Sequence, residues 1–200
     1  GGLKTLVAGT PLDLSLSGKH SDGNKEKTSV GGSLIIGDAK GEHQKLSGEY
    51  DAVTGALRIR TDYKADGNTY YTEDKRNAEG DVTNTRGLNL QLGENTDLSL
   101  KDTMGPEGYG AYGKFSAKDI GGSGLTASLG HGSGTLEGTN LGLAYKSKVL
   151  TSSLDLALKP GGSSLTHSTD YKANGLTAGY NFDINLSDGR LQELGAKFGW

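Results

Sequence analysis

Apolar and polar residues alternate in short segments that run almost from one end of the chain to the other. In residues 57–64, for example, Leu57 and Ile59 alternate with Arg58 and Arg60. A period of two is typical of β-strands whose two faces meet different surroundings, whereas an α-helix repeats about every 3.6 residues. The same alternation recurs in residues 12–17, 88–92, 154–158 and 176–186.

Turn sequences rich in glycine, asparagine and aspartate separate these segments and supply the positive φ angles that tight hairpins need. The spacing predicts about fourteen strands, within a range of roughly 12–14, and the connections are too short for parallel pairing. We therefore predict an all-β, antiparallel, up-and-down meander that forms a single domain over residues 1–200.

An internal repeat tests this strand count. The segment TDYKADGNT at residues 61–69 recurs as TDYKANGLT at residues 169–177. At about 13–14 residues for each strand with its turn, the two copies lie about eight strands apart. An even separation places both turns at the same rim of the sheet, with Tyr63 and Tyr171 on its apolar face. The alternative is that two unrelated hairpins share one favourable turn.

An antiparallel meander with one apolar face has three physical solutions. It can fold as a two-sheet sandwich, as a soluble barrel with that face inward, or as a membrane barrel with that face toward lipid. The apolar positions are mostly leucine, which suits lipid, because a packed core usually mixes side chains of different sizes. The opposite face is polar and suits a water-filled lumen. The lumen-lining candidates are Arg58, Arg60, Asp62, Lys64, Asn181, Asp183, Glu193 and Lys197.

Strand length agrees with the membrane solution. A strand of about ten residues, tilted by about 40°, covers a hydrocarbon layer of about 25 Å. Only alternate residues of such a strand meet lipid, so a low overall hydropathy is expected. We therefore predict a closed antiparallel transmembrane β-barrel.

The end of the chain strengthens this prediction. Its last alternate positions are Leu194, Ala196, Phe198 and Trp200. A terminal aromatic residue with apolar residues at the third, fifth and seventh places from the end resembles the C-terminal signature of bacterial outer-membrane β-barrel proteins. The resemblance implies a last strand that closes the barrel against the first, and final residues that the barrel-assembly machinery recognises. It also implies the outer membrane of a Gram-negative bacterium, with outer-membrane lipid around the barrel.

These inferences predict a porin-like channel for passive diffusion of small hydrophilic solutes, in which lumen charges tune selectivity. One alternative is a β-barrel anchor or component of a larger envelope or export complex, bound to other envelope proteins or assembled as a homo-oligomer. Another is a soluble secreted β-sheet adhesin, which leaves the phased Trp200 unexplained. The prediction includes no enzymatic activity, no cofactor and no metal.

Aromatic residues make up only 6% of the chain, so two complete girdles at the membrane interfaces are not expected. His167 falls in phase with the apolar positions, which suits a place near an interface. The charged segment 68–80 alternates weakly and is predicted to rise above the membrane as a hairpin. A partial aromatic belt is predicted from Tyr63, Tyr145, Tyr171, Tyr180 and Phe182.

Composition excludes several classes of protein. Glycine is unusually frequent, with 34 residues in 200, but it has no collagen-like period. The chain contains no cysteine, which excludes disulfides and thiolate metal sites. A formal net charge of -3, with acids and bases interleaved, gives no electrostatic basis for nucleic-acid binding. No apolar run is long enough for a transmembrane helix, and no N-terminal stretch reads as a signal peptide.

Two ligand motifs are better interpreted as strands. Residues 108–113 match GxGxxG, but the residues that follow continue strand alternation where a dinucleotide site needs a helix. Residues 62–73 have the length of an EF-hand loop, but Lys64 occupies a position that needs an oxygen ligand. We predict a strand and a hairpin at these places.

Catalytic interpretations are equally weak. The four histidines lie in separate segments without the spacing of metal ligands. His167 and Asp170 are three residues apart, so in a strand they point to opposite faces. The local cluster His20, Ser21 and Asp22 falls in a predicted turn, where such residues are common. For the predicted lumen cations Arg58, Arg60 and Lys64, pairing with acids on neighbouring strands is favoured over a free anion site, and the candidate acids are Glu49, Asp51 and Glu73.

Overall fold

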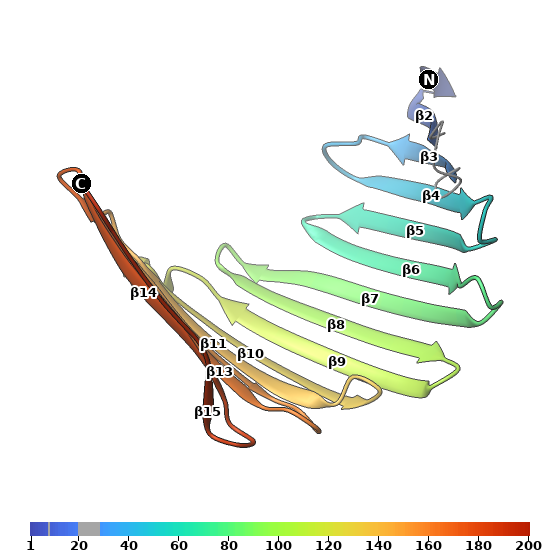
Figure 1. Ribbon diagram of the computed structural model, residues 1–200. Helices are drawn as coiled ribbons and strands as arrows, with labels where there is room; N and C mark the ends of the chain where they lie inside the picture. Colours follow the sequence, from blue (N-terminus) through green and yellow to red (C-terminus); the bar gives the residue numbers. More distant parts are fainter. Residues whose placement is uncertain (8, 20–28) are drawn as a thin grey trace. The chain divides into compact units, whose positions relative to one another are not determined.

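The computed structural model describes residues 1–7, 9–19 and 29–200. In this part of the chain it contains fifteen β-strands and one short 3-10 helix, η1 (Ile120–Gly122), which confirms the all-β prediction. The strands follow one another in the sheet in their order along the chain, from β1 to β15, and form an antiparallel meander as predicted. Figure 1 shows β3 to β9 side by side in this order. The order has two end strands, β1 and β15, which are not joined by a ladder within the described residues.

The chain divides into two compact units. The first comprises Gly1–Leu90 and Leu100–Tyr109, and the second comprises Gln91–Ser99 and Gly110–Trp200. Six strands belong wholly to the first unit: β1 (Gly2–Val7), β2 (Thr10–Lys19), β3 (Ser29–Gly37), β4 (His43–Asp51), β5 (Leu57–Ala65) and β6 (Asn68–Arg76). Three strands have residues in both units: β7 (Val82–Gly93), β8 (Thr96–Gly105) and β9 (Gly108–Ala117). Six belong wholly to the second: β10 (Leu125–Gly134), β11 (Gly138–Lys146), β12 (Leu150–Leu158), β13 (Ser164–Ala173), β14 (Leu176–Asn185) and β15 (Arg190–Gly199).

The repeated segments behave as predicted. They form the β5–β6 and β13–β14 hairpins, which are eight strands apart in the strand order. Asp66 and Gly67 have φ angles of 51° and 77°, and Asn174 and Gly175 have 52° and 80°. Positive φ at both central residues is the geometry of the two-residue turn whose twist matches the flanking strands.

The described residues contain fifteen strands, where the sequence predicts about fourteen. The difference arises at connections without distinctive turn residues. The β10–β11 connection is Thr-Leu-Glu at 135–137, and the β11–β12 connection is Ser-Lys-Val at 147–149. The three residues of each connection include no glycine, asparagine or aspartate, although Gly134 and Gly138, which flank the first connection, have positive φ angles.

Cross-strand partners share a face, and in the first unit the two faces differ sharply. An apolar row crosses β2, β3 and β4 through Leu14, Leu34 and Leu46. On the opposite face a row of serines crosses the same strands, and the hydroxyls of Ser15 and Ser33 lie 2.7 Å apart.

The second unit repeats the arrangement over more strands. Its polar face carries Gly142, Asp155, Thr166 and Asp183 in one row from β11 to β14. Its apolar face carries a continuous row of aliphatic partners from β10 to β14, namely Leu129, Leu141, Leu156, Leu165 and Ile184.

The apolar faces have nothing packed against them. Among the described residues, no hydrophobic side chain is buried, and large apolar side chains are exposed along the whole chain. Leu143 is 50% exposed, Leu194 70% and Phe198 67%. The sheet is therefore stabilised by its ladders and by contacts between adjacent strands, and it has no interior core in the described residues.

One tyrosine packs over two glycines on the polar face of the second unit. Tyr112 of β9 covers Gly130 and Gly132 of β10, and Asn140 Nδ2 of β11 donates a hydrogen bond to its hydroxyl at 3.3 Å. A Cβ atom on Gly130 would overlap the Tyr112 hydroxyl. Glycine is therefore required at this position by the close approach of an aromatic ring.

We predict that Gly130→Ala lowers the free energy of unfolding by about 1–3 kcal/mol, because the added methyl group displaces Tyr112 from the sheet. The measurement is urea unfolding of the protein folded in detergent micelles or vesicles. Gly162→Ala is the matched control, since a Cβ atom there meets no atom within 4 Å. Adding Tyr112→Ser to Gly130→Ala should cost less than the two separate losses combined; strict additivity would contradict the steric explanation.

Candidate functional site: the polar face

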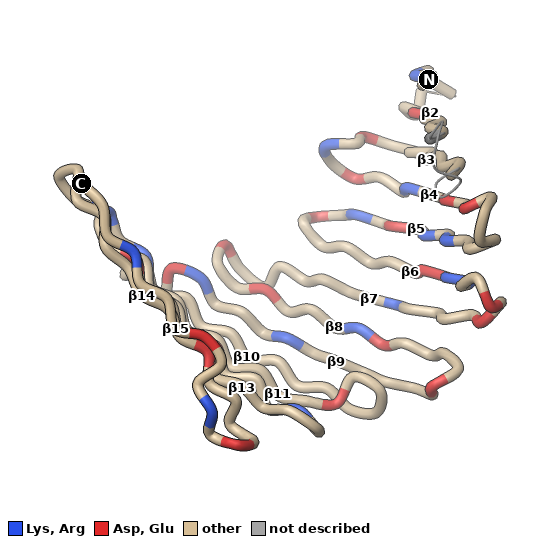
Figure 2. The backbone as a smooth tube through the Cα atoms, in the orientation of Figure 1, with Lys and Arg blue, Asp and Glu red and all other residues tan. Residues whose placement is uncertain are grey.

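A charged cluster lies on the polar face of the first unit. It consists of Arg58, Arg60 and Asp62 from β5 and Glu73 and Lys75 from β6, and Figure 2 shows charged residues along these strands. Strand alternation turns all five side chains to the same face, and the register sets Arg60 opposite Glu73. The cluster is thus a direct product of the period-two pattern and the β5–β6 hairpin.

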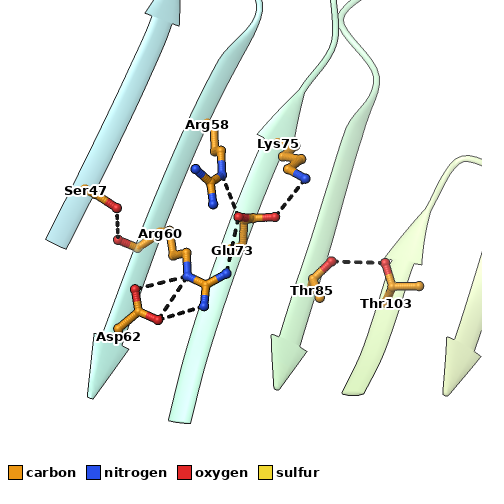
Figure 3. Close-up of polar contacts among 8 residues, drawn as sticks. All are labelled: Ser47, Arg58, Arg60, Asp62, Glu73, Lys75, Thr85 and Thr103. Carbon is orange, nitrogen blue, oxygen red and sulfur yellow. Dashed lines mark hydrogen bonds and ion pairs between the residues drawn. The ribbon is translucent and has the colours of Figure 1, made fainter. Parts of the chain in front are cut away.

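Glu73 is the centre of this charged cluster. Arg58 Nε donates to its Oε2 at 2.6 Å, and Lys75 Nζ lies 2.9 Å from Oε1 (Figure 3). Arg60 Nη1 lies 3.7 Å from Oε2. Glu73 is 7% exposed, and three cations around one shielded carboxylate hold it ionised and fixed in place.

Arg60 is held from two further sides. Its Nε donates to both oxygens of Asp62 at 3.0 Å, and its Nη2 donates to Oδ1 at 2.8 Å. Its guanidinium carbon lies 4.0 Å from the centre of the Tyr71 ring. Tyr71 in turn lies against Gly87, where a Cβ atom would overlap the ring. The guanidinium group of Arg60 is therefore held in one orientation on the polar face of the sheet.

The preference for pairing over a free anion site is confirmed for both arginines, and Glu73 is the predicted acid that pairs with them. Asp51 acts elsewhere: its Oδ1 accepts hydrogen bonds from the backbone N–H groups of Val53 and Thr54 at 2.9 and 3.1 Å. It closes the β4–β5 turn and is not an ion-pair partner of Arg58 or Arg60. Glu49 lies opposite Arg58 in the β4–β5 ladder.

Two hollows on the polar face border the charged cluster. One has a volume of about 620 Å³ and is lined by residues that include Glu49, Arg58, Lys75 and Asp81. The other has a volume of about 340 Å³ and is lined by residues that include Ser15, Ser33, Ser47 and Lys45, together with Glu49 and Arg58. Hydroxyl and charged groups line the smaller hollow, whereas the larger one is lined by Ala56 and Leu57 as well as by charged groups.

The predicted polar residues of the second unit also share one face. Lys197 Nζ lies 2.6 Å from Asp170 Oδ1, and Asn181 Nδ2 donates to Glu193 Oε1 at 3.0 Å. Asp183 is directly opposite Glu193 in the β14–β15 ladder, and its Oδ1 is buried without a hydrogen-bond partner in the described structure. A smaller hollow of about 190 Å³ lies beside Asp170 and Lys197.

All eight lumen-lining candidates therefore lie on the polar face of their own unit. Lys64, the only one not yet placed, sits opposite His43 and Thr69 on that face of the first unit. The structure adds Glu73 and Lys75 as full members of the charged cluster. It also adds Tyr71, which sequence reasoning missed because Tyr70 and Tyr71 are adjacent and lie on opposite faces.

The predicted aromatic belt divides into two groups. Tyr63 lies close to the β5–β6 turn, and Tyr145 and Tyr171 lie close to the β11–β12 and β13–β14 turns. Tyr180 and Phe182 lie farther along β14, where their ring centres are 5.3 and 5.2 Å from that of His167. All five are on the apolar face of their unit, as their phase predicts.

His167 lies on the apolar face of the second unit and finds polar partners there. Its Nε2 lies 2.9 Å from Thr169 Oγ1 and 3.1 Å from Tyr180 Oη. Thr169 Oγ1 also lies 2.9 Å from Ser152 Oγ. Local hydroxyl groups thus satisfy an imidazole that would otherwise be costly on an apolar surface.

The catalytic pair that the sequence considered within the described residues, His167 and Asp170, does not come together. His167 is on the apolar face and Asp170 on the polar face, as predicted. The cluster of His20, Ser21 and Asp22 lies outside the described residues. No group of three or more potential ligands that could hold a metal ion occurs in the residues searched. Residues 108–113 form the start of β9, and residues 62–73 form the β5–β6 hairpin, as predicted.

Comparison with known proteins found no matching family model, no matching curated protein and no matching solved structure. In the part of the chain that the structure describes, no helix has the length and apolar character needed to cross a membrane.

We predict that Glu73→Gln lowers the free energy of unfolding by about 1–3 kcal/mol, because three cations lose their shared carboxylate and Gln cannot replace its charge. The measurement is urea unfolding at neutral pH. Glu79→Gln, an exposed residue between β6 and β7, is the matched control and should change stability by less than about 0.5 kcal/mol. Equal effects of the two substitutions would contradict a central role for Glu73.

Proposed function

We propose that the chain forms the wall of a closed β-barrel channel in the outer membrane of a Gram-negative bacterium, through which small hydrophilic solutes diffuse passively. The observation that carries the proposal is the contrast between the faces. One face exposes aliphatic and aromatic side chains with no core behind them, and the other carries, in the first unit, the charged cluster and the two hollows beside it. In water the first face would be unstable, whereas hydrocarbon removes that cost.

Strand dimensions support a membrane location. Strands β2 to β15 contain 9–12 residues, which is the length that crosses a bilayer at the tilt of membrane barrels. Alternate positions along these strands are leucine-rich, and a surface that meets fluid lipid needs apolar character without interlocking shapes. The low share of aromatic residues is compatible with a partial belt near the turns.

The apolar residues of β15 and Trp200 also agree with the proposal. In β15, Leu194, Ala196 and Phe198 face the same way as their β14 partners Phe182, Tyr180 and Ala178. The Phe198 and Trp200 rings meet edge to face, with centres 5.7 Å apart. In the proposed membrane setting, this apolar end of the chain is the signal that the barrel-assembly machinery recognises.

One part of the apolar face supports the predicted hairpin above the membrane. Asp74 and Arg76 of β6, together with Asn84 and Arg86 of β7, lie on the face that carries Leu57 and Ile59 in the neighbouring strand β5. Charged groups toward hydrocarbon cost about 2–4 kcal/mol each at the midplane and little near an interface. We therefore place this end of β6 and β7 beyond the hydrocarbon layer.

In this proposal the protein performs no bond chemistry. Solutes pass along the polar face, and selectivity depends on the width of the lumen and on the charges of its wall. The charged cluster has three cations and two carboxylates, so its net charge is +1. A wall charge of this sign favours small anions modestly over cations of the same size.

A second candidate is a barrel that anchors or completes a larger envelope assembly. The observation in its favour is that the described sheet has two end strands, β1 and β15, with no ladder between them. A soluble adhesin is the third candidate, and it requires another layer over the apolar faces.

The purified chain should need detergent to stay monodisperse and should migrate faster unheated than boiled in detergent gels. A protein that is monodisperse without detergent would leave only the adhesin.

We predict that Leu143→Arg, on the apolar face, weakens folding into phospholipid vesicles by about 2–4 kcal/mol, because the guanidinium must enter hydrocarbon. Ala144→Arg is the matched control: it is the next residue of β11, faces the polar side and should cost less than about 1 kcal/mol. Urea titration of vesicle-folded protein measures both. A larger loss for Ala144→Arg would mean that the faces are assigned the wrong way round.

We predict that planar-bilayer recordings of refolded protein show conductance with weak anion preference. Arg58→Ala combined with Arg60→Ala changes the charge of the cluster from +1 to -1, so the reversal potential in a salt gradient should shift toward cation preference. A control that removes Lys40 and Lys148, which lie in turns, should shift it less. Absence of any conductance would exclude the channel and leave the anchor.

A further inference from the structure

The two end strands of the described sheet present open edges. β1 is exposed along its whole length, and β15 along most of it. At the β1 edge, Gly1 and Leu16 exchange both backbone hydrogen bonds, at 3.0 and 2.8 Å. Hydrogen-bonded and non-hydrogen-bonded pairs alternate along an antiparallel ladder, so the residues that turn their N–H and C=O groups away from β2 are Gly2, Lys4 and Leu6.

Open edges of this kind are incompatible with hydrocarbon. An unpaired peptide group in lipid costs several kcal/mol, which is why membrane-spanning sheets close on themselves. In water, an exposed edge is a template for pairing with another strand. Both edges therefore require a partner if the proposed membrane location holds.

Strand direction limits which partner fits. Neighbouring strands of an antiparallel meander alternate in direction, and β1 and β15 are separated by an even number of steps. The two edge strands therefore run in the same direction. A direct β1–β15 joint would be a parallel ladder in a sheet whose described ladders are otherwise antiparallel, and it would be less stable for each residue.

Further copies of the chain do not remove this mismatch. Copies inserted the same way in a membrane are related by rotation about its normal, which leaves strand directions unchanged. Since β1 and β15 run the same way within one copy, every joint between copies is also parallel. A homo-oligomeric barrel thus meets the same obstacle as direct closure.

We propose that the sheet is completed by a polypeptide segment that contributes an odd number of strands, one in the simplest case, pairing antiparallel with β1 and β15. This inference rests on the proposed membrane function. The segment has alternating apolar and polar residues over about 9–11 positions. Its apolar side continues the face that carries Leu3 and Phe198, and its polar side continues the face that carries Lys4 and Lys197.

Two extended variants test directly whether an odd number of added strands is needed. The first carries a copy of residues 176–189, which is β14 with its following loop, joined before Gly1. The second carries a copy of residues 164–189, which adds β13 and its hairpin. β14 is an even-numbered strand and therefore runs antiparallel to both β1 and β15. The added sequences share composition and alternation, so strand number is the main difference between the variants.

Amide hydrogen exchange of the vesicle-folded variants measures whether the β1 and β15 edges are paired. Both additions should slow exchange at Gly2, Lys4 and Leu6, which shows that the copied β14 docks on β1. Only the one-strand variant should slow, by about tenfold or more, the β15 amides that do not bond to β14. It should also show the larger migration shift between unheated and boiled samples.

Two results would overturn the inference. One is slow exchange of the outward β15 amides in the unextended chain, which would mean that the chain or its copies close unaided. The other is equal protection of those amides in the one-strand and two-strand variants. If none of the three proteins inserts into vesicles and all stay monodisperse without detergent, the proposed membrane function itself fails, and this inference fails with it.

Discussion

The strict alternation of side chains across a sheet without a core is the constraint on which the structure depends. Within a regular strand, a shift of one residue in register moves every side chain to the opposite face, and a bulge such as the one in the β14–β15 ladder is what interrupts this alternation. The row from Leu129 to Ile184 is apolar because each strand keeps this phase, and the same phase turns Arg58, Arg60 and Glu73 to the polar side. Hydrophobic stabilisation is then available only from surroundings beyond the sheet.

This constraint also explains the character of the candidate site. A charged cluster on an ordinary soluble sheet would face bulk water and contribute little. Here Glu73 is shielded by Arg58, Arg60 and Lys75, and Arg60 is held by Asp62 and by the ring of Tyr71. A fixed set of charges gives the polar face of the first unit a defined electrostatic character, which is the property by which the proposed channel would select among small solutes.

Pattern and turn chemistry were sufficient to predict most strands and the face of every lumen candidate, because both depend on residues that are neighbours in sequence. The connection at 147–149 was not predictable, since Ser, Lys and Val carry no turn signal. The juxtaposition of Asp183 and Glu193 was not predictable either, because the register shifts between Asp183 and Ile184, so that counting from the β14–β15 turn gives the wrong partner. The place of Tyr71 beside Arg60 was not predicted, because it depends on the contact of Tyr71 with Gly87 on another strand. Sequence spacing alone does not indicate such a contact.

The packing of Tyr112 over two glycines of β10 has a consequence for how the sheet unfolds. Contacts between strands in this structure join immediate neighbours, so the sheet resembles a linear array whose stability is a sum of adjacent terms. Such an array frays from its ends and has little cooperativity over long distances. Tyr112 from β9 crosses β10 and bonds to Asn140 of β11, which couples strands that are not adjacent. A link of this kind beyond nearest neighbours should make strand loss through β9–β11 less favourable than elsewhere in the array.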